Sequence, residues 1–266
     1  MRLTSAVRLL AVAATFMAAA PLSAQKVLII NGASGTSEPG TTASITTQLT
    51  NLHTAAGNIV TVSDGLPVDL SQYKQVWDIR FSNNWALTSS DEAAYLSFLQ
   101  GGGGMFLMGE NAGFMTRNNS IFDFIMQAGG GSLGFDNTGS DAQAVCSPFT
   151  GPNAVSSISY AAAGFFNGSG TGQWITGPSC AAASGGSGIA FGVGSLANAS
   201  AGALTTILDV NFMQTTADAN SQALTRNLIG YVGDQVTATP EPASVVLLAT
   251  GLVGVFGAAR RRKKSV

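Results

Sequence analysis

Polar side chains follow several predicted buried strands, where the ends of parallel strands would bring them together. Glu110 comes two residues after the apolar run 105–108, and a carboxyl there can bind a sugar hydroxyl or transfer a proton. We expect a small-molecule or sugar pocket, without hydrolysis, at this edge of the sheet. Its candidate residues are Asn31, Gly32, Asp78, Arg80, Glu110 and Asn111. Alternatively, Glu110 and Asn111 only cap the helix predicted over 118–128 or bind turn amides.

Other kinds of site find little support in the residue types. His53 is the single histidine and follows Leu49 by four positions in a predicted helix, so we expect it on a helix face or partly packed. One histidine and two cysteines match no zinc spacing. The turn 32–36 lacks the lysine of a P-loop. The segment 136–141 is rich in oxygen ligands but lacks the EF-hand order, so we expect a solvated loop there. We predict no metal and no cofactor.

The chain has two cysteines, Cys146 and Cys180. In an oxidising compartment a disulfide between them is the simplest prediction, and it would contribute about 3–4 kcal/mol by restricting the unfolded chain. A catalytic thiol is the alternative, but no recognisable motif supplies a base beside either cysteine.

Strands and helices that alternate along the first half must position these residues. Thr88 and Asp91 are spaced as a capping box that begins one of the helices. The alternation predicts an α/β fold with a mostly parallel sheet and helices on both faces. The predicted strands are 26–31, 58–63, 75–81 and 105–108, and the predicted helices are 42–56, 89–99 and 118–128.

The second half carries a weaker pattern. Gly, Ser, Ala and Asn dominate from about 130 to 202, which predicts a β-rich insertion or sheet extension carrying the disulfide. Phe165, Phe166 and Trp174 either pack beneath it or form a stacking platform for carbohydrate. The predicted strands are 155–160, 173–176, 188–196 and 204–212, followed by a helix over 219–232.

The runs 27–31, 66–73 and 105–113 resemble the class I glutamine amidotransferase-like superfamily. The resemblance implies a flavodoxin-like fold and a cysteine or serine at the centre of a Gly-x-nucleophile-x-Gly turn. Here Gly109-Glu110-Asn111-Ala112-Gly113 has Asn111 at that position. The histidine and acid positions correspond to Met213 and Thr215, so we expect no catalytic triad.

The C-terminus has three consecutive elements: Pro240-Glu241-Pro242, the uncharged segment 243–259, and a basic cluster beginning Arg260-Arg261-Arg262. As a helix, the uncharged segment would span about 26 Å, enough for a thin bilayer core. The basic residues then predict a cytoplasmic tail over 260–266. These elements resemble the PEP-CTERM sorting signal of Gram-negative bacteria, which implies cleavage by an exosortase and delivery to the cell surface or matrix. An ordinary membrane anchor is the alternative.

The N-terminus also predicts export. Arg2 and Arg8 precede the apolar run 9–20 and a small-residue site, which indicates a signal peptide over 1–24. One amidotransferase-like domain would follow over 25–236, then a linker with the sorting motif over 237–242. The expected intermediate is anchored in the inner membrane by a transmembrane helix over 243–259.

The expected mature body is acidic, with five basic and 13 acidic residues between positions 25 and 239, a net charge of −8. Nucleic acid is therefore excluded as a partner, because phosphate binding needs clustered Lys and Arg. We expect an exported surface or matrix protein whose non-catalytic domain binds or scaffolds, in association with exopolysaccharide. The alternative is an extracellular hydrolase that uses Glu110 or an unrecognised serine.

Overall fold

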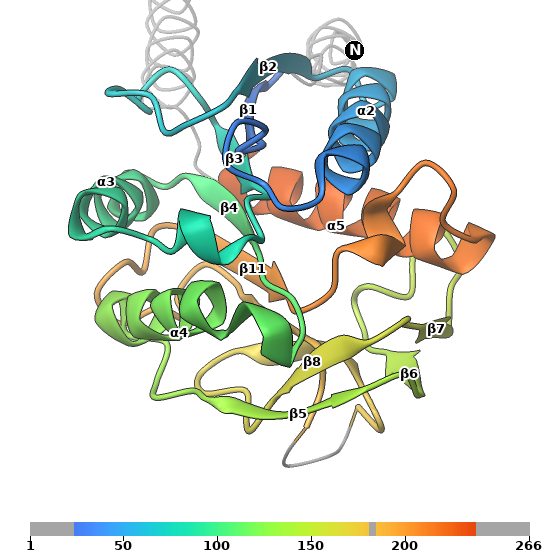
Figure 1. Cartoon of the computed structure of the whole chain (residues 1–266). Coiled ribbons are helices and arrows are strands. Elements are labelled where there is room, and N and C mark those ends of the chain that lie inside the picture. Colours follow the sequence, from blue (N-terminus) through green and yellow to red (C-terminus); the bar gives the residue numbers. More distant parts are fainter. Residues whose placement is uncertain (1–23, 181–184, 238–266) are drawn as a thin grey trace, which may run out of the picture.

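A nine-stranded mixed sheet runs through the molecule, with helices on both faces (Figure 1). The computed structural model describes residues 24–180 and 185–237. Within these ranges no helix is long and apolar enough to cross a membrane. The predicted signal peptide up to residue 23, the Pro-Glu-Pro motif, the segment 243–259 and the basic tail lie outside the described residues.

Five parallel strands form one part of the sheet, in the order β2-β1-β3-β4-β11. Strands β3, β4 and β11 are buried along their whole length, and β1 is buried after its first residue. Burial on both faces explains why β4, and β1 after its first residue, are apolar runs rather than alternations of apolar and polar residues. Counted along the chain, the order is 2-1-3-4-5, that of a doubly wound sheet. The strands are β1 (Lys26–Ile30), β2 (Ile59–Ser63), β3 (Gln75–Asp78), β4 (Gly104–Met108) and β11 (Ala203–Ile207).

The sheet separates the core into two layers, and two helices cover each layer. Val27 and Ile29 of β1 pack on the α2 and α5 side, whereas Leu28 and Ile30 pack on the α3 and α4 side. This alternation follows from the two-residue period of a strand. The predicted α/β fold with helices on both faces is confirmed. The helices are α2 (Pro39–Ala55), α3 (Ser89–Gln100), α4 (Met115–Ala128) and α5 (Ala219–Thr237).

The predicted capping box at the start of α3 is present. The Thr88 side chain accepts a hydrogen bond from the Asp91 amide, and the Asp91 side chain accepts one from the Thr88 amide. Two amides that the helix leaves unpaired are satisfied in this way. Helix α2 begins earlier than predicted, with Pro39 in its first turn, where the missing N–H of proline costs nothing.

Two strands end earlier than predicted because acidic side chains turn the backbone. The strand expected over 75–81 ends at Asp78, whose Oδ1 accepts a hydrogen bond from the Arg80 amide at 3.0 Å. The strand expected over 204–212 ends at Ile207, and Asp209 Oδ1 accepts the Phe212 amide at 3.1 Å. That bond starts the short 3₁₀ helix η4 (Asn211–Met213).

The second half extends the sheet with antiparallel strands and adds a separate two-stranded ribbon, β5–β8. The sheet is therefore mixed, not mostly parallel throughout. The solvated loop expected over 136–141 is wrong in its first part, because Phe135–Gly139 pairs with β8. The strands are β5 (Phe135–Gly139), β6 (Ala142–Val145), β7 (Ser157–Ser159), β8 (Ala163–Phe166), β9 (Gln173–Gly177) and β10 (Gly188–Phe191).

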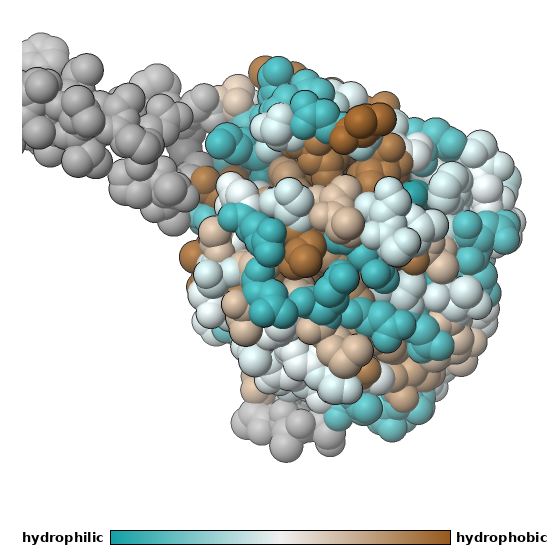
Figure 2. All heavy atoms as spheres, turned by 90° about the vertical axis from the view of Figure 1, so that its left-hand side faces the viewer, coloured by the Kyte–Doolittle hydropathy of each residue, from teal (hydrophilic) through white to brown (hydrophobic). Residues whose placement is uncertain are grey.

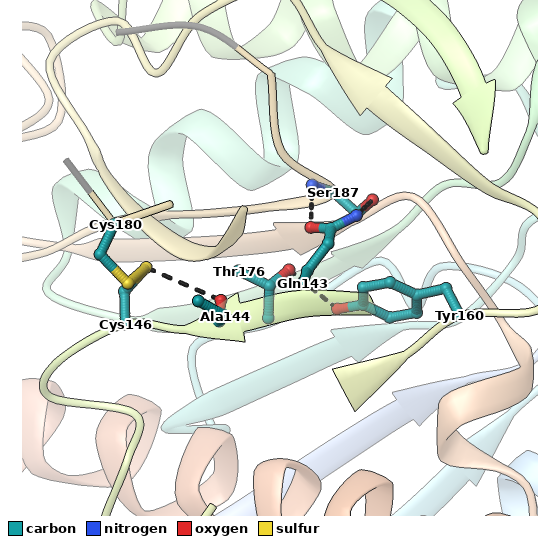
Figure 3. The surroundings of a disulfide bond; sticks show 7 residues. All are labelled: Gln143, Ala144, Cys146, Tyr160, Thr176, Cys180 and Ser187. Carbon is teal, nitrogen blue, oxygen red and sulfur yellow. Dashed lines mark hydrogen bonds between the residues drawn. A yellow bond between two sulfur atoms is a disulfide. The ribbon is translucent and has the colours of Figure 1, made fainter. Parts of the chain in front are cut away.

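The predicted disulfide between Cys146 and Cys180 is present, with the two Cα atoms 5.4 Å apart (Figure 3). It joins the segments that follow β6 and β9. Nearby, Gln143 exchanges two hydrogen bonds with Ser187, and the Tyr160 hydroxyl lies 2.9 Å from Thr176 Oγ1. These buried polar groups hold the antiparallel strands in register.

Aromatic side chains of the second half are buried. Phe165, Phe166 and Trp174 are each at most 7% exposed, so packing, not a stacking platform, is their observed role. On the face shown in Figure 2, hydrophobic patches are small and separated by hydrophilic residues. Exposed apolar side chains such as Val68 and Met126 come from separate segments, a distribution that is normal for a protein surface.

Candidate functional site at the carboxyl edge of the sheet

Four adjacent parallel strands, β1, β3, β4 and β11, end at the same edge of the sheet. All six predicted pocket residues lie at or just beyond the ends of the first three. The structure brings them to one edge but divides them into two groups, one around Asp78 and one around Glu110.

Asp78 and Arg80 form a buried ion pair with three further partners. The Arg80 guanidinium donates to both carboxylate oxygens of Asp78, through Nε at 2.9 Å and Nη2 at 2.8 Å. Arg117 Nη2 lies 3.2 Å from Asp78 Oδ2, and the Tyr95 hydroxyl donates to the same oxygen at 2.8 Å. Asp91 lies 3.9 Å from Arg80 and supplies the second negative charge, so the four charges balance.

This cluster is fixed by its own electrostatics. Burial raises the pKa of the Asp78 carboxyl, but the charges of Arg117 and Arg80 outweigh that effect and hold the pKa well below its ordinary value. Asp78 therefore stays ionised, and its oxygens are occupied by protein donors. Arg117 is anchored further by donating to the Met108 and Trp85 carbonyls. Arg117 therefore links Asp78, at the end of β3, to Met108, the last residue of β4.

Gly32 lies beneath an indole ring. Its φ of +61° favours glycine, and an added Cβ would lie 2.6 Å from Trp85 Nε1. The indole donates to the Gly32 carbonyl at 3.0 Å, and the Arg80 guanidinium lies over the same ring. Asn31 accepts the Ala33 amide and donates to Thr46. Trp85 therefore fills the space above the end of β1 that the sequence assigned to a pocket.

Glu110 and Asn111 bind the turn that follows β4. Glu110 Oε1 accepts the Asn111 amide at 2.8 Å, and Oε2 accepts the Val210 amide at 3.0 Å. Asn111 Oδ1 accepts the Gly113 amide and begins the 3₁₀ helix η3 (Ala112–Phe114). Asn118 of α4 clamps the turn by bonding the amide and carbonyl of Glu110. Both predicted residues thus cap backbone amides, the simpler of the two roles expected from the sequence.

Asp209, which the sequence did not single out, pairs electrostatically with Glu110. Each lies two residues beyond its strand, and the last residues of β4 and β11, Met108 and Ile207, are register partners. Burial and then the charge of Asp209 raise the pKa of Glu110 to about 8, and burial raises the pKa of Asp209 to about 6. Among the described residues, Asp209 Oδ2 has no hydrogen-bond partner. An acid two residues after the end of a strand, the spacing that Glu110 has from Met108, was the sequence signal for this residue.

The β5–β8 ribbon covers this carboxyl pair. The Gly164 amide donates to the Leu208 carbonyl at 2.8 Å, and a Cβ on Gly164 would lie 2.9 Å from the Glu110 carbonyl oxygen. Thr138 of β5 accepts the Ala112 amide. As a result Glu110 is only 4% exposed and Asp209 is fully buried.

The positions matched to a catalytic triad make structural contacts. Met213 is fully buried in the core, and Thr215 bonds Ser44 of α2 through both its amide and its hydroxyl. His53 is fully buried, deeper than the helix-face position predicted, and lies edge-on to Trp77. Within residues 24–180 and 185–237, no three His, Cys, Asp or Glu side chains are grouped as metal ligands.

Comparison with known proteins confirms the sorting signal. Residues 238–263 match the PEP-CTERM protein-sorting motif. The chain therefore carries a signal for export through the membrane to the cell surface in Gram-negative bacteria, and the motif implies processing by an exosortase. No curated protein matches the sequence.

Solved structures resemble the described domain at low sequence identity. The mmIFT52 N-terminal domain is 9% identical, with a TM-score of 0.56 over 81% of this chain and 98% of that chain. A ThuA-like protein from Bacteroides uniformis is 12% identical, with a TM-score of 0.52 over 81% and 94% of the two chains. Another from Parabacteroides merdae is 11% identical, with a TM-score of 0.50 over 83% and 94%. The domain has a flavodoxin or glutamine amidotransferase-like fold.

Proposed function

We propose that this exported protein delivers a non-catalytic binding or scaffold domain to the cell surface or extracellular matrix, in association with exopolysaccharide. The domain spans residues 25–236. The sorting motif accounts for delivery to the cell surface, and the role of the folded domain is what we propose here. The observation that carries it is the closed carboxyl edge of the sheet, where enzymes of this fold type place their chemistry.

Three features of that edge support a role without turnover. A carboxamide, Asn111, stands at the nucleophile position and its Oδ1 is bound to the Gly113 amide. Both carboxyl oxygens of Glu110 accept backbone amides, so they do not face a substrate. The ribbon β5–β8 and the Trp85 ring occupy the space above the strand ends.

The membrane steps of the proposal concern segments outside the described residues. A signal peptide over 1–24 starts export, and the helix 243–259 holds the intermediate in the inner membrane with residues 260–266 in the cytoplasm. An exosortase then cuts near Pro240–Pro242. Mass spectrometry of the protein from its native host should find Gln25 at the N-terminus and a C-terminus near the motif. Surface protein that keeps both unprocessed ends would contradict these steps.

One observation favours the alternative, an extracellular hydrolase. Glu110 and Asp209 form a carboxyl pair with unequal raised pKa values, and such a pair can supply a general acid near neutral pH. Panels of ester, amide and glycoside substrates distinguish the two functions. Turnover by the wild type that Glu110→Gln abolishes would establish the hydrolase and refute the proposal.

Association with exopolysaccharide is tested by co-sedimentation. The mature protein is mixed with polysaccharide isolated from the native host and centrifuged, with an unrelated secreted acidic protein as the control. We expect the mature protein to enter the pellet and the control to stay in solution. Equal partitioning of the two proteins would refute the association.

A further inference from the structure

A cavity of about 400 Å³ lies at the opposite edge of the sheet, where the parallel strands begin. Gln25 directly precedes β1, Asn58 precedes β2, and Gln75 is the first residue of β3. The end of α2 and the second half of α5 form its sides, with Leu52 and Ile229 as apolar walls. Its size lies within the range of small-molecule pockets, and none of the groups at the carboxyl edge line it.

Two glutamine side chains form a rigid polar floor. Gln75 Nε2 donates to Gln25 Oε1 at 2.5 Å, and Gln25 Nε2 donates to the Gly233 carbonyl at 3.1 Å. The Trp77 indole donates to Gln75 Oε1 at 3.0 Å, which fixes the orientation of that amide. Gln25 is half-buried and its NH₂ group has a second hydrogen to donate, whereas Gln75, only 1% exposed, fixes the orientation of Gln25 from beneath.

Two asparagine side chains add oriented acceptors. Asn58 Nδ2 lies 3.1 Å from His53 Nδ1, and burial lowers the pKa of His53 to about 3, so the imidazole is neutral and can accept. Asn153 Nδ2 donates to Asn227 Oδ1 at 2.9 Å. Among residues 24–180 and 185–237, no hydrogen bond uses Oδ1 of Asn58 or Asn153. Both oxygens can therefore accept from a ligand.

The charged residues of the cavity balance. Arg226 and Asp234 both line it and both are exposed. Within the described part of the chain, Arg226 forms no ion pair. A cavity with one charge of each sign, several oriented amides and two apolar walls suits an uncharged ligand that has many hydroxyls and an apolar ring face.

We propose that this cavity binds one neutral hexose unit of a glycan, with its hydroxyls on the carboxamides and Arg226 and its C–H face on Leu52 and Ile229. The inference rests on the proposed function and gives it a site. It also separates binding from the carboxyl edge, because every contact comes from the amino edge of the sheet or from the parts of the chain that line the cavity beside it.

Gly230 offers a clean test because it lines the cavity and an added Cβ would meet no atom within 4 Å. Gly230→Leu therefore introduces a side chain at the cavity from a position where the Cβ is unobstructed, and it replaces a poor helix former within α5. Gly40→Leu is the matched control: Gly40 lies in α2, its Cβ position is equally open, and it does not line the cavity. Arg226→Gln, with Lys74→Gln as its charge-matched control, tests the polar contact.

The mature protein and its variants are titrated calorimetrically with glucose, galactose, mannose and their disaccharides, and with glucuronic acid for comparison. We expect at least one neutral sugar to bind, and Gly230→Leu and Arg226→Gln to weaken it about tenfold or more, because hydrogen bonds to charged groups are strong. Both controls should bind as the wild type does. Unchanged affinity in Gly230→Leu, stronger binding of glucuronic acid, or no neutral-sugar binding would overturn the inference.

The two proposals fail in different ways. If Gly230→Leu still co-sediments fully with host polysaccharide while the wild type does too, the hexose site is wrong and the proposed function stands. If the wild type does not co-sediment, the association with exopolysaccharide is wrong.

Discussion

The Glu110 carboxyl should make the stability of the domain fall as pH rises from about 5 to 8. In the folded protein its pKa is about 8, against an ordinary value of 4.5, because of burial and then the charge of Asp209. Between these values the folded state holds a proton that the unfolded chain has released, so each step up in pH favours unfolding. The penalty is absent below about pH 4.5 and complete above about pH 8.

The size of the effect follows from the pKa difference. A difference of about 3.5 corresponds to at most about 5 kcal/mol, at 1.36 kcal/mol for each pKa unit. Asp209, whose pKa is raised to about 6, adds to the loss at the acidic end of the range. Glu110→Gln removes the titration but directs an NH₂ group at a backbone amide, a mismatch that costs about 1–3 kcal/mol at any pH.

Urea unfolding at pH 5, 6.5 and 8 measures this difference. The wild type should lose several kcal/mol of unfolding free energy across the series, whereas Glu110→Gln should start lower and change much less. Asp123→Asn, an exposed change of the same charge on α4, is the control and should follow the wild type. A wild type equally stable at pH 5 and 8, or a Glu110→Gln variant with the same slope, would refute this account of the buried pair.

Three further changes test other parts of the fold. Asp78→Asn leaves Arg80 and Arg117 buried without their shared counter-charge and should cost about 3–5 kcal/mol in urea unfolding; a loss below 1 kcal/mol would contradict the described network. Replacing both disulfide cysteines by serine should lower stability by about 3–4 kcal/mol, and adding a reductant to that variant should change nothing. Thr88→Ala removes one half of the α3 capping box and should cost about 1 kcal/mol, measured by thermal unfolding.

The sequence predicted the parallel core well because burial on both faces leaves a direct mark on composition. The runs 27–30 of β1 and 105–108 of β4 are apolar without interruption, and Thr88 with Asp91 marks the start of α3. Strand β5, Phe135–Gly139, has no apolar run, because its residues are half-buried or exposed. It forms a strand by pairing with β8, which comes later in the sequence. Local pattern cannot identify a strand that is stabilised mainly by a distant partner.

For the candidate site, too, the local sequence predicted one part and long-range packing decided the other. The sequence predicted that Asp78, Arg80 and Glu110 would converge on one edge of the sheet. They do so because β3 ends at Asp78, earlier than the strand predicted over 75–81. The sequence did not identify the side chains that occupy that edge. Trp85 comes from the segment between β3 and β4, and Arg117 comes from α4, which follows β4. Whether a side chain at a strand end faces solvent or an internal partner depends on such long-range packing.

The hydrogen bond between Gln25 and the Gly233 carbonyl places the entry and exit of the folded chain side by side. An attachment to the membrane through either end would therefore hold the same side of the domain. Cleavage at one end would leave that side attached through the other end. Strand β7 lies seven strand spacings from β1, or about 34 Å along the sheet. The disulfide-bonded extension therefore lies at the far end of the sheet from the strand that the chain enters first.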